Sequence, residues 1–534
     1  MTNDEIHTQA CGLAKAAMHL AAKGKMSALD LSRQAVELAS DSFTLSAHCR
    51  VALQLYDTDA LENAVRLMEA QSEECPALHS LVCDMRSGPL AAVELARQLS
   101  VRGPADMEPV PGRILYVLDK SLPQATDGYA TRSHGIVRAL LQKGVDLVCV
   151  TRPGFPYDLH QDSNVSEAAD LVEVVDGVKY HRLAWPRRSC FPAMPMESMA
   201  YGSLAYLRQS TKRLAEAIAR HRPACVVAAS NMATALPACL AAHGSGLPFV
   251  YEVRGFWEIT RASRDPQYLL TPTGRQERYL EVATALAAEA VVTLTGAMRN
   301  ELVLRGVPEQ RIVLAPNASD PHRFSPIPRD PALMQQLRLH EDMPVIGYVG
   351  TFNPYEGLDD LVRACAGLRQ EGLEFRLVLV GSGPEKVDGH CVVTEQLLEL
   401  ADKLGLGEWV IMPGRVLYED AVRWYSLIDI AAFPRKPKSV TEFVSPLKPL
   451  EALAMEKAVV VSSVGGMREM VEDGRTGLVF PKGDPSALGA ALRKLLKNEK
   501  LRQNLGKKGR AWIQQERSWR DAANEMLNAL EPVM

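Results

Sequence analysis

Long apolar runs are missing from this sequence. No stretch approaches the ~20 consecutive apolar residues that a helix needs to cross a bilayer. The start Met-Thr-Asn-Asp-Glu has neither the basic nor the apolar part of a secretory signal. Together these absences predict a chain without a membrane span. We therefore expect the protein in the cytoplasm, either free or peripheral at the inner face of the membrane.

Close cysteine pairs and a strong charge imbalance are also absent. The 10 cysteines include no Cys-x-x-Cys pair, which predicts reduced, mostly buried thiols rather than a disulfide framework. Cys75, His79 and Cys83 have helical spacing, but Pro76 interrupts the pattern and argues against a metal site. The net charge of −4 gives no general attraction for nucleic acid, so we predict no nucleic-acid partner.

Strand patterns are nearly absent from residues 1–102, which we expect to form a separate helical domain within a chain long enough for two or three domains. Three similar segments, 28–39, 60–69 and 90–99, begin about thirty residues apart, with another helix between successive copies. This period indicates either a tetratricopeptide-like array of helical hairpins or an irregular helical cap. Both interpretations stay open, as does a protein partner bound through these residues.

The motif Asp57-Thr58-Asp59 has the Asp-x-Asp form that metal-dependent sugar-transferring enzymes use to hold a cation. It lies between two helical segments, where Asp and Thr are ordinary helix N-caps, so we favour capping. Residues 103–112 then combine three prolines and two glycines in a short polar run. Such a composition is typical of a linker, and it predicts a domain boundary.

Alternating strands and helices begin at residue 113. A buried strand over 113–119, a helix over 130–143 and a strand over 146–151 form a βαβ unit, typical of a doubly wound α/β domain. Further strands are expected at 171–175, 179–183, 225–229, 249–253 and 290–294. The loop 120–129 leaves the first strand at the carboxyl edge of the sheet, where such folds bind ligands. Gly128 in this loop serves either a turn or a ligand.

A second series of strands begins at 345–350 and continues at 376–380. The glycines of Gly381-Ser382-Gly383 do not complete a Gly-x-Gly-x-x-Gly pattern, because Lys386 occupies the third position. A dinucleotide-binding fingerprint is therefore not supported. A helix is expected over 417–426, before a further strand.

The stretch 443–462 gives the strongest indication of function in this sequence. Ser445-Pro446-Leu447 leads into a short helix that contains Lys448 and Glu451 in its first turn and precedes a buried β-branched strand. A helix start carries roughly half a positive charge and directs free N–H groups outward, so it favours a phosphate. A carboxylate beside that phosphate can bind sugar hydroxyls.

Together with Gly465-Gly466-Met467-Arg468-Glu469 and Asp473-Gly474-Arg475-Thr476-Gly477, this stretch resembles the donor-binding signature of family 4 glycosyltransferases. The resemblance implies an α/β protein of GT-B fold, in which two Rossmann-like domains face a cleft. It also implies retaining sugar transfer from a nucleotide diphosphate-sugar, without a metal or other cofactor. The acceptor domain would span 113–324 and the donor domain 325–515, with 516–534 returning to the acceptor domain.

The resemblance also implies roles for individual residues. Donor binding is expected from Gly128, Gly350, Thr351, Arg415, Val416, Ser445, Pro446, Leu447, Lys448 and Glu451. Acceptor binding is expected from Tyr129, Arg132 and Arg254, and catalysis from Lys448, Arg254 and Glu451. For Arg254, a surface ion pair with Glu252 or Glu258 is the alternative to ligand binding.

Two departures from the family pattern concern charged residues. The family commonly has Glu-x7-Glu; Glu451 matches the second Glu, but Phe443 occupies the first position and Glu442 is one residue out of register. The loop 350–357 lacks the Arg and Lys that the family directs at the diphosphate. Lys448 is well placed to replace them, because it lies at the helix start beside Glu451.

Three functions stay open from the sequence. We favour a glycosyltransferase that uses a glycan, lipid-linked or protein acceptor in cell-surface glycoconjugate synthesis. The alternative from another class is a catalytically silent GT-B binding protein that acts through its N-terminal helices. A GT-B sugar-nucleotide epimerase is a third possibility, although it has no evident use for the added helices.

Overall fold

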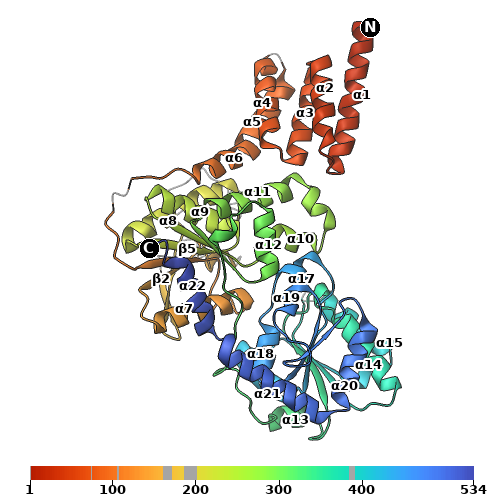
Figure 1. Ribbon diagram of the computed structural model, residues 1–534. Coiled ribbons are helices and arrows are strands. Elements are labelled where there is room, and N and C mark those ends of the chain that lie inside the picture. The colour runs from red at the N-terminus through yellow and green to blue at the C-terminus, as the bar shows by residue number, and fades with distance from the viewer. Residues whose placement is uncertain (1, 74, 105–106, 160–170, 186–200, 384–390) are drawn as a thin grey trace.

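The computed structural model describes residues 2–73, 75–104, 107–159, 171–185, 201–383 and 391–534. It consists of an N-terminal bundle of helices followed by two α/β domains (Figure 1). Residues 105 and 106 of the predicted linker lie outside the described residues. None of the described helices is both long and apolar enough to cross a membrane.

The first part of the chain is entirely helical, as predicted. Its helices are α1 Asn3–Ala22, α2 Ser27–Leu38, α3 Ser42–Leu55, α4 Thr58–Ser72, α5 Pro76–Ser87 and α6 Pro89–Gln98. The three similar sequence segments correspond to α2, α4 and α6, and one helix lies between each pair of copies. Asp57 is the N-cap of α4, and its side chain accepts a hydrogen bond of 2.9 Å from the Ala60 N–H. The capping interpretation of the Asp-x-Asp motif is therefore confirmed.

The helical bundle is joined to the first α/β domain by apolar and polar contacts. Leu95 and Leu99, in and just after α6, belong to the buried core of that domain. Gln54 donates a hydrogen bond of 2.6 Å to the carbonyl of Leu270, and the rings of Tyr56 and Tyr279 lie 5.5 Å apart. The bundle is therefore packed against the domain rather than attached by the linker alone.

The first α/β domain has an 8-stranded sheet in the order β3-β4-β2-β1-β5-β6-β7-β8. Only β3 runs antiparallel to its neighbour. The strands are β1 Ile114–Leu118, β2 Leu147–Thr151, β3 Leu171–Val175, β4 Val178–Arg182, β5 Cys225–Ala229, β6 Phe249–Val253, β7 Ala290–Thr293 and β8 Ile312–Leu314. The helices are α7 Gly128–Gln142, α8 Leu204–His221, α9 Met232–Gly244, α10 Trp257–Ala262, α11 Pro272–Ala287 and α12 Gly296–Leu304.

The second α/β domain has a 6-stranded parallel sheet in the order β11-β10-β9-β12-β13-β14. Its strands are β9 Val345–Val349, β10 Arg376–Val380, β11 Val410–Gly414, β12 Ile430–Phe433, β13 Ala458–Ser462 and β14 Leu478–Phe480. The helices are α13 Pro331–Gln336, α14 Leu358–Gln370, α15 Val392–Lys403, α16 Ala421–Leu427, α17 Ser439–Phe443, α18 Lys448–Ala454, α19 Gly465–Arg468, α20 Pro485–Leu496 and α21 Glu499–Glu516.

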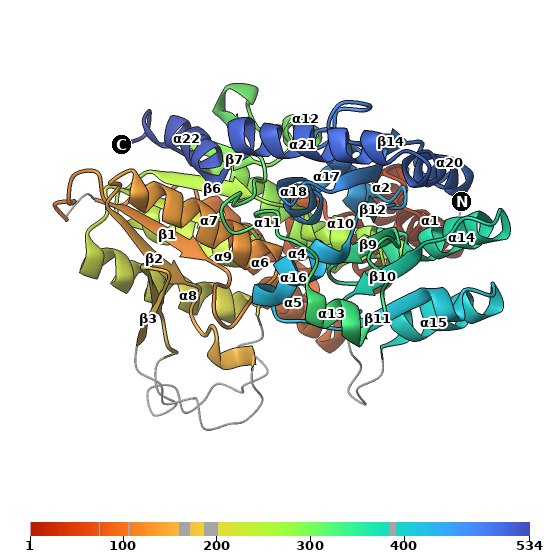
Figure 2. The same ribbon diagram turned by 90° about the horizontal axis from the view of Figure 1, so that it is seen from below.

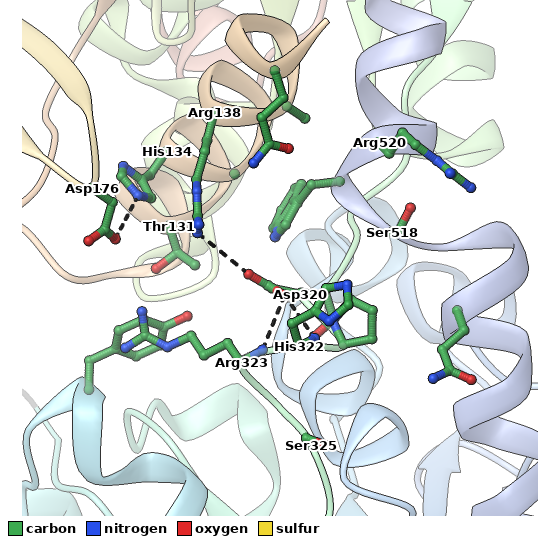
Figure 3. A pocket seen from close by; sticks show the side chains of 18 of the residues that line it. Thr131, His134, Arg138, Asp176, Asp320, His322, Arg323, Ser325, Ser518 and Arg520 are labelled. Carbon is green, nitrogen blue, oxygen red and sulfur yellow. Dashed lines mark hydrogen bonds and ion pairs between the residues drawn. The ribbon is translucent and has the colours of Figure 1, made fainter.

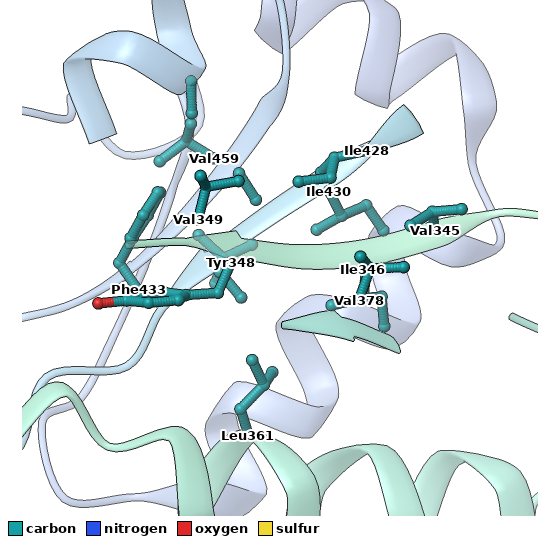
Figure 4. Close-up of a cluster of buried hydrophobic side chains, with 14 of the residues drawn as sticks. Val345, Ile346, Tyr348, Val349, Leu361, Val378, Ile428, Ile430, Phe433 and Val459 are labelled. Atoms are coloured by element: carbon teal, nitrogen blue, oxygen red, sulfur yellow. The ribbon is translucent and has the colours of Figure 1, made fainter. Parts of the chain in front are cut away.

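Helices cover both faces of this second sheet, so its central strands are apolar on both sides. Figure 4 shows part of the resulting core, where Val345, Ile346 and Val349 of β9 lie among side chains of the neighbouring strands. The continuous apolar runs that predicted the strands arise from this burial. The predicted helix over 417–426 begins later than expected, because a 3-10 turn over Tyr418–Asp420 precedes α16.

The chain passes between the two α/β domains twice. Residues 315–325 lead from β8 to the second domain, and residues 516–519 lead back from α21 to α22 Trp519–Leu530. We call these two segments the hinge. They lie side by side, because the Ser319 N–H donates a hydrogen bond of 3.0 Å to the Arg517 carbonyl. Figure 2 shows α21 and α22 in a row along the two domains.

Helix α22 is anchored on the first sheet. It contributes Ala523, Met526 and Leu530 to the core that includes β1 and α7. The indole of Trp519 fits against Gly135 of α7, where an added Cβ would lie 2.4 Å from the ring. Only a residue without a side chain allows this close approach.

Candidate functional site

The loop that follows α17 touches the first α/β domain at the carboxyl ends of its strands. The Phe443 carbonyl accepts a hydrogen bond of 2.9 Å from the Thr295 hydroxyl, and the rings of Phe443 and Phe256 lie 5.6 Å apart. The Asn317 amide donates a hydrogen bond of 2.7 Å to the Ser445 carbonyl. The stretch that predicted donor binding is therefore at the junction of both domains, where parallel α/β sheets bind ligands.

Lys448 lies directly against the loop that follows β9. Its ammonium donates hydrogen bonds to the Tyr348 hydroxyl, to the Thr351 carbonyl at 3.2 Å and to Glu356 at 3.2 Å. Gly350 has a φ of +143°, and a Cβ there would lie 2.2 Å from Cε of Lys448. The lysine side chain reaches its partners only because position 350 has no side chain.

Glu356 holds two cations in a buried cluster. Its carboxylate forms a two-pronged ion pair with Arg435, at 2.9 and 3.0 Å, and a third contact with Lys448. Burial alone would raise the pKa of Glu356, but Arg435 and Lys448 lower it to about 2. Arg435 also donates a hydrogen bond of 3.0 Å to the Val444 carbonyl, so the cluster supports the donor-binding loop. Burial lowers the pKa of Lys448, and Glu356 opposes that effect.

Glu451 lies one helical turn beyond Lys448 in α18, and it is only 9% exposed. Its carboxylate accepts a hydrogen bond of 3.3 Å from the Tyr425 hydroxyl. Burial raises the pKa of Glu451 to about 7, while Tyr425 and Lys448 act in the opposite direction. One carboxylate oxygen has no hydrogen-bond donor among the described residues, which leaves it available to a ligand hydroxyl.

Arg415 directly follows β11, an edge strand of the second sheet, and so lies at the carboxyl ends of the strands. Its guanidinium donates to the Ser382 hydroxyl at 2.8 Å and to the Gly383 carbonyl at 3.0 Å. These contacts join the turn after β11 to the turn after β10, and Val416 follows directly in the chain. Both turns lie at the same edge as Gly350, since β9, β10 and β11 are adjacent parallel strands.

Gly128 begins α7 and faces the loop before α18 from the first domain. A Cβ added at Gly128 would lie 3.8 Å from Leu447, an ordinary contact distance. The glycine is therefore not required by this packing. The preceding residue, Asp127, caps α7 by accepting hydrogen bonds from the N–H groups of Tyr129 and Ala130. Gly128 and Leu447, two residues predicted to bind the donor, thus lie close together at the start of α18.

The arginines predicted to contact the acceptor lie beneath the surface of the first domain. Arg132 and Arg254 both form ion pairs with Glu252, at 2.8 and 2.7 Å, and all three are buried. Arg132 directs its remaining donors to the carbonyls of Ala315 and Pro316 and to a side chain of the hinge. Burial alone would raise the pKa of Glu252, but the two arginines lower it to about 2.

These positions revise the prediction for the two arginines. Arg132 is 1% exposed, so no face of its guanidinium is open to an acceptor. Arg254 forms the ion pair with Glu252 that was the alternative to ligand binding, but the pair is buried rather than on the surface. Its guanidinium also stacks 4.3 Å from the ring centre of Tyr129 and donates to the Tyr129 carbonyl. Tyr129, by contrast, is partly exposed.

Comparisons with known proteins agree with this geometry. Residues 127–318 match the glycosyl transferase 4-like domain, and residues 330–512 match the glycosyl transferases group 1 family. The chain is 30% identical over 295 residues to a D-inositol 3-phosphate glycosyltransferase of Xylanimonas cellulosilytica, covering 54% of this chain and 67% of that protein. The chain belongs to the family 4 glycosyltransferases.

Further similarities extend over most of the two α/β domains of this glycosyltransferase. A D-inositol 3-phosphate glycosyltransferase of Kineococcus radiotolerans is 28% identical over 373 residues, covering 67% of this chain and 82% of the relative. Among solved structures, sucrose-phosphate synthase from Thermosynechococcus elongatus aligns with a TM-score of 0.60 at 20% identity, covering 79% of this chain and 98% of that one. The GT-B fold predicted from the sequence is confirmed.

The structure also adds residues of this glycosyltransferase that sequence reasoning missed. Tyr348, Glu356 and Arg435 surround Lys448, and none of the three is among the site residues predicted from the sequence. A signal was present, because an acidic residue in the loop 350–357 requires a basic partner once it is buried. Glu442, one residue out of register, pairs with Lys482 and accepts a hydrogen bond of 2.8 Å from the Gly465 N–H.

Within the described residues, no group of three or more His, Cys, Asp or Glu side chains is arranged to hold a metal ion. Of the Cys75, His79 and Cys83 series, Cys83 and His79 are in contact at 3.7 Å on α5. Cys75 instead precedes α5 as its N-cap residue.

Proposed function

We propose that this glycosyltransferase moves a sugar, with retention and without a bound metal, from a nucleotide diphosphate-sugar to a hydroxyl of a cell-surface glycoconjugate precursor. The observation that carries the proposal is the position of Lys448. Its ammonium lies against Gly350 and Thr351, in the loop from which the family pattern directs two basic residues at the diphosphate. The chain thus supplies a charge that the loop 350–357 itself lacks.

Lys448 is assigned to the leaving diphosphate. As the bond between the anomeric carbon and the phosphate oxygen breaks, its electron pair stays on that oxygen and negative charge develops there. A fixed ammonium stabilises this charge more in the transition state than in the ground state. All three ammonium donors are already engaged, so we expect the diphosphate to replace the 3.2 Å contact with the Thr351 carbonyl.

Glu451 is assigned to the ribose, whose two neighbouring hydroxyls can donate to one carboxylate. Arg415 and Val416 are assigned to the side of the base, since their turn lies at the same sheet edge. Ser445, Pro446 and Leu447 form the wall that faces the first domain. Tyr129 is assigned to the acceptor side, and Arg254 positions it by stacking on its ring.

The acceptor belongs, in our proposal, to glycan, lipid-linked or protein substrates. Relatives of this chain include a mannosyltransferase of Mycolicibacterium smegmatis named for phosphatidylinositol monomannoside, and a capsular polysaccharide glycosyltransferase of Staphylococcus aureus. A solved structure of similar fold, Anabaena Alr3699/HepE, contains UDP and glucose at 15% identity and a TM-score of 0.58. Residues 1–126 lie outside both matched family regions, so the helical bundle is assigned to recruiting a partner or acceptor.

The test uses the purified full-length protein with a panel of nucleotide sugars. We expect one donor to stabilise the protein, which at 100 times its dissociation constant amounts to about 2.7 kcal/mol, and to be hydrolysed slowly without acceptor. The first sugar product should have the anomeric configuration of the donor, and EDTA should leave the rate unchanged. Binding without hydrolysis or transfer would support the silent binding protein instead, and loss of rate in EDTA would contradict metal independence.

A further inference from the structure

The hinge adjoins the ribose side of the proposed donor site. The ring of Phe324, in the first hinge segment, lies 6.2 Å from that of Tyr418 and 6.1 Å from that of Tyr425. The Tyr425 hydroxyl donates a hydrogen bond of 3.3 Å to Glu451, the carboxylate assigned to the ribose. Packed rings therefore connect the hinge with Glu451.

Arg323 directly precedes Phe324 and lies against the same group of rings. Its guanidinium stacks 4.1 Å from the ring centre of Tyr418. Both residues line a cavity of about 810 Å³ beside the hinge, and Figure 3 shows the Arg323 side chain extending away from Arg520. Within the described residues Arg323 forms no ion pair. Its positive charge is therefore not neutralised by a carboxylate in contact with it.

Arg510 of α21 holds this part of the hinge against α18, the helix that contains Glu451. Its guanidinium donates a hydrogen bond of 3.0 Å to the Phe324 carbonyl and another to the carbonyl of Ala454, the last residue of α18. The position of Arg323 relative to α18 is therefore fixed from two sides, by the tyrosine rings and by these main-chain carbonyls.

Few charged or titratable groups surround Glu451 in the part of the chain that the structure describes. Those that face it from α18, from α16 and the turn before it, and from the hinge are Lys448, Tyr425, Tyr418 and Arg323. Of the other elements packed on α18, strands β12 and β13 contain no titratable residue. Helix α21 directs Arg510 to main-chain carbonyls.

Two cations oppose the effect of burial on Glu451. Burial raises the pKa of Glu451 to about 7, and the Tyr425 hydroxyl, Lys448 and Arg323 act in the opposite direction. Lys448 also pairs with Glu356 at 3.2 Å and is assigned to the diphosphate. Arg323 has no such second acid among the described residues, so its charge acts mainly on Glu451.

We propose that Arg323 is a positioning residue of the donor site, whose charge keeps Glu451 in the ionised form that accepts hydrogen bonds from two ribose hydroxyls. The inference rests on the proposed function, which assigns Glu451 to the ribose. A nearby cation favours the charged form of a carboxyl group, and the effect is stronger where water is partly excluded. Arg323 acts on the nucleotide only through Glu451.

The first test needs no nucleotide. Arg323→Gln removes the charge and keeps a side chain of similar polarity, and denaturant unfolding compares it with Glu451→Gln and with the double variant. At pH 8.5 Arg323→Gln should cost more stability in the presence of Glu451 than of its Gln replacement. At pH 5.5 folded Glu451 is protonated, so the cost should be the same in both backgrounds. Equal costs at pH 8.5 would overturn the proposal.

The second test is calorimetry of the full-length protein with UDP and with GDP between pH 6 and pH 9. In Arg323→Gln the rise of affinity with pH should move upward by about half a pH unit, or roughly threefold in the ionisation constant. Arg323→Lys should restore most of this shift, because it restores the charge. Arg138→Gln in the same cavity and Lys508→Ala, an exposed position of α21, should leave the profile in place.

The outcomes separate this inference from the proposed function. Unchanged nucleotide affinity in Glu451→Gln would contradict the ribose assignment, while the unfolding measurements would still decide whether Arg323 acts on Glu451. Weaker binding in Glu451→Gln, with the pH profile unmoved in Arg323→Gln, would overturn the role of Arg323 and leave the ribose assignment standing. A loss of affinity in Arg323→Gln that is equal at every pH and is not restored by Arg323→Lys would also overturn it.

Discussion

The ammonium of Lys448 lies 3.2 Å from the carboxylate of Glu356, a residue of the loop that lacks the family's basic pair. That loop therefore supplies an acid instead of two cations, and the acid positions a lysine and an arginine from elsewhere in the chain. In this chain the loop 350–357 contributes the acidic residue Glu356, and the basic residues come from other segments, at Arg435 and Lys448. Each of these contributions can be tested separately.

Lys448→Ala should reduce kcat by about 10²–10³, as loss of one transition-state donor typically does. Lys448→Arg should recover only part of the rate, because a planar guanidinium does not replace a compact ammonium in so close a space. Steady-state kinetics with the donor found above measure both effects, and Lys508→Ala is the matched control for lost positive charge. Constants within about twofold of the unaltered protein would move the diphosphate role to Arg415.

Gly350→Ala should impair catalysis without unfolding the protein. Its new Cβ would lie 2.2 Å from Lys448, so the ammonium must leave its place. The matched control is Gly372→Ala, also a glycine at positive φ, +81°, in the second domain, but with nothing within 4 Å of the added Cβ. Both variants carry backbone strain of about 1 kcal/mol or more, and only Gly350→Ala should lose kcat. Equal activity of the two variants would show that kcat does not depend on the Lys448 ammonium staying beside residue 350.

Glu356→Gln should destabilise the folded protein by about 3–5 kcal/mol at neutral pH, because it leaves Arg435 and Lys448 buried without their counter-charge. The effect depends on pH in a defined direction. The folded pKa of Glu356, about 2, lies below its usual value, so its stabilising contribution is complete above the unfolded pKa and falls as pH drops toward 2. Denaturant unfolding at pH 7 and pH 3.5 measures this, and the difference between the two proteins should shrink at the lower pH.

Glu451→Gln should weaken nucleotide binding by roughly 1.5–3 kcal/mol, the range for hydrogen bonds to a charged group. Since the pKa of Glu451 is about 7, the carboxylate that accepts from ribose forms only as pH rises through 7. Nucleotide affinity of the unaltered protein should therefore increase between pH 6 and pH 8, while that of Glu451→Gln should stay nearly constant. Calorimetry at both values checks this, and equal affinities at pH 8 would exclude Glu451 from the site.

The sequence predicts the strands of the two sheets better than it predicts which side chains contact one another. Parallel strands buried on both faces need continuous apolar residues, so runs such as 376–380 and 225–229 identify them directly. The helix start with Lys448 and Glu451 could also be predicted, because a proline in the first turn and the spacing of residues are local properties. The contact between Lys448 and Gly350 depends on how β9 and α18 pack, and no local pattern records it.

Arg254 illustrates why the acceptor side was harder to predict. Charged residues at the end of a strand usually face a ligand, which favoured Arg254 as a binding residue. Residues two apart in a strand point to the same side, so Glu252 and Arg254 meet each other there. Arg132 joins them from α7, a helix far away in the sequence. The three charges are satisfied internally, by ion pairs with one another.

The double passage of the chain through the hinge limits how the two α/β domains can move. A single connecting strand would allow swivelling about its own bonds as well as bending. Two segments joined by the hydrogen bond from Ser319 to Arg517 resist torsion of one domain relative to the other, because twisting would separate the two segments. The remaining freedom is rotation about a line through both segments, which changes the gap between Lys448 and α7 while keeping them in alignment.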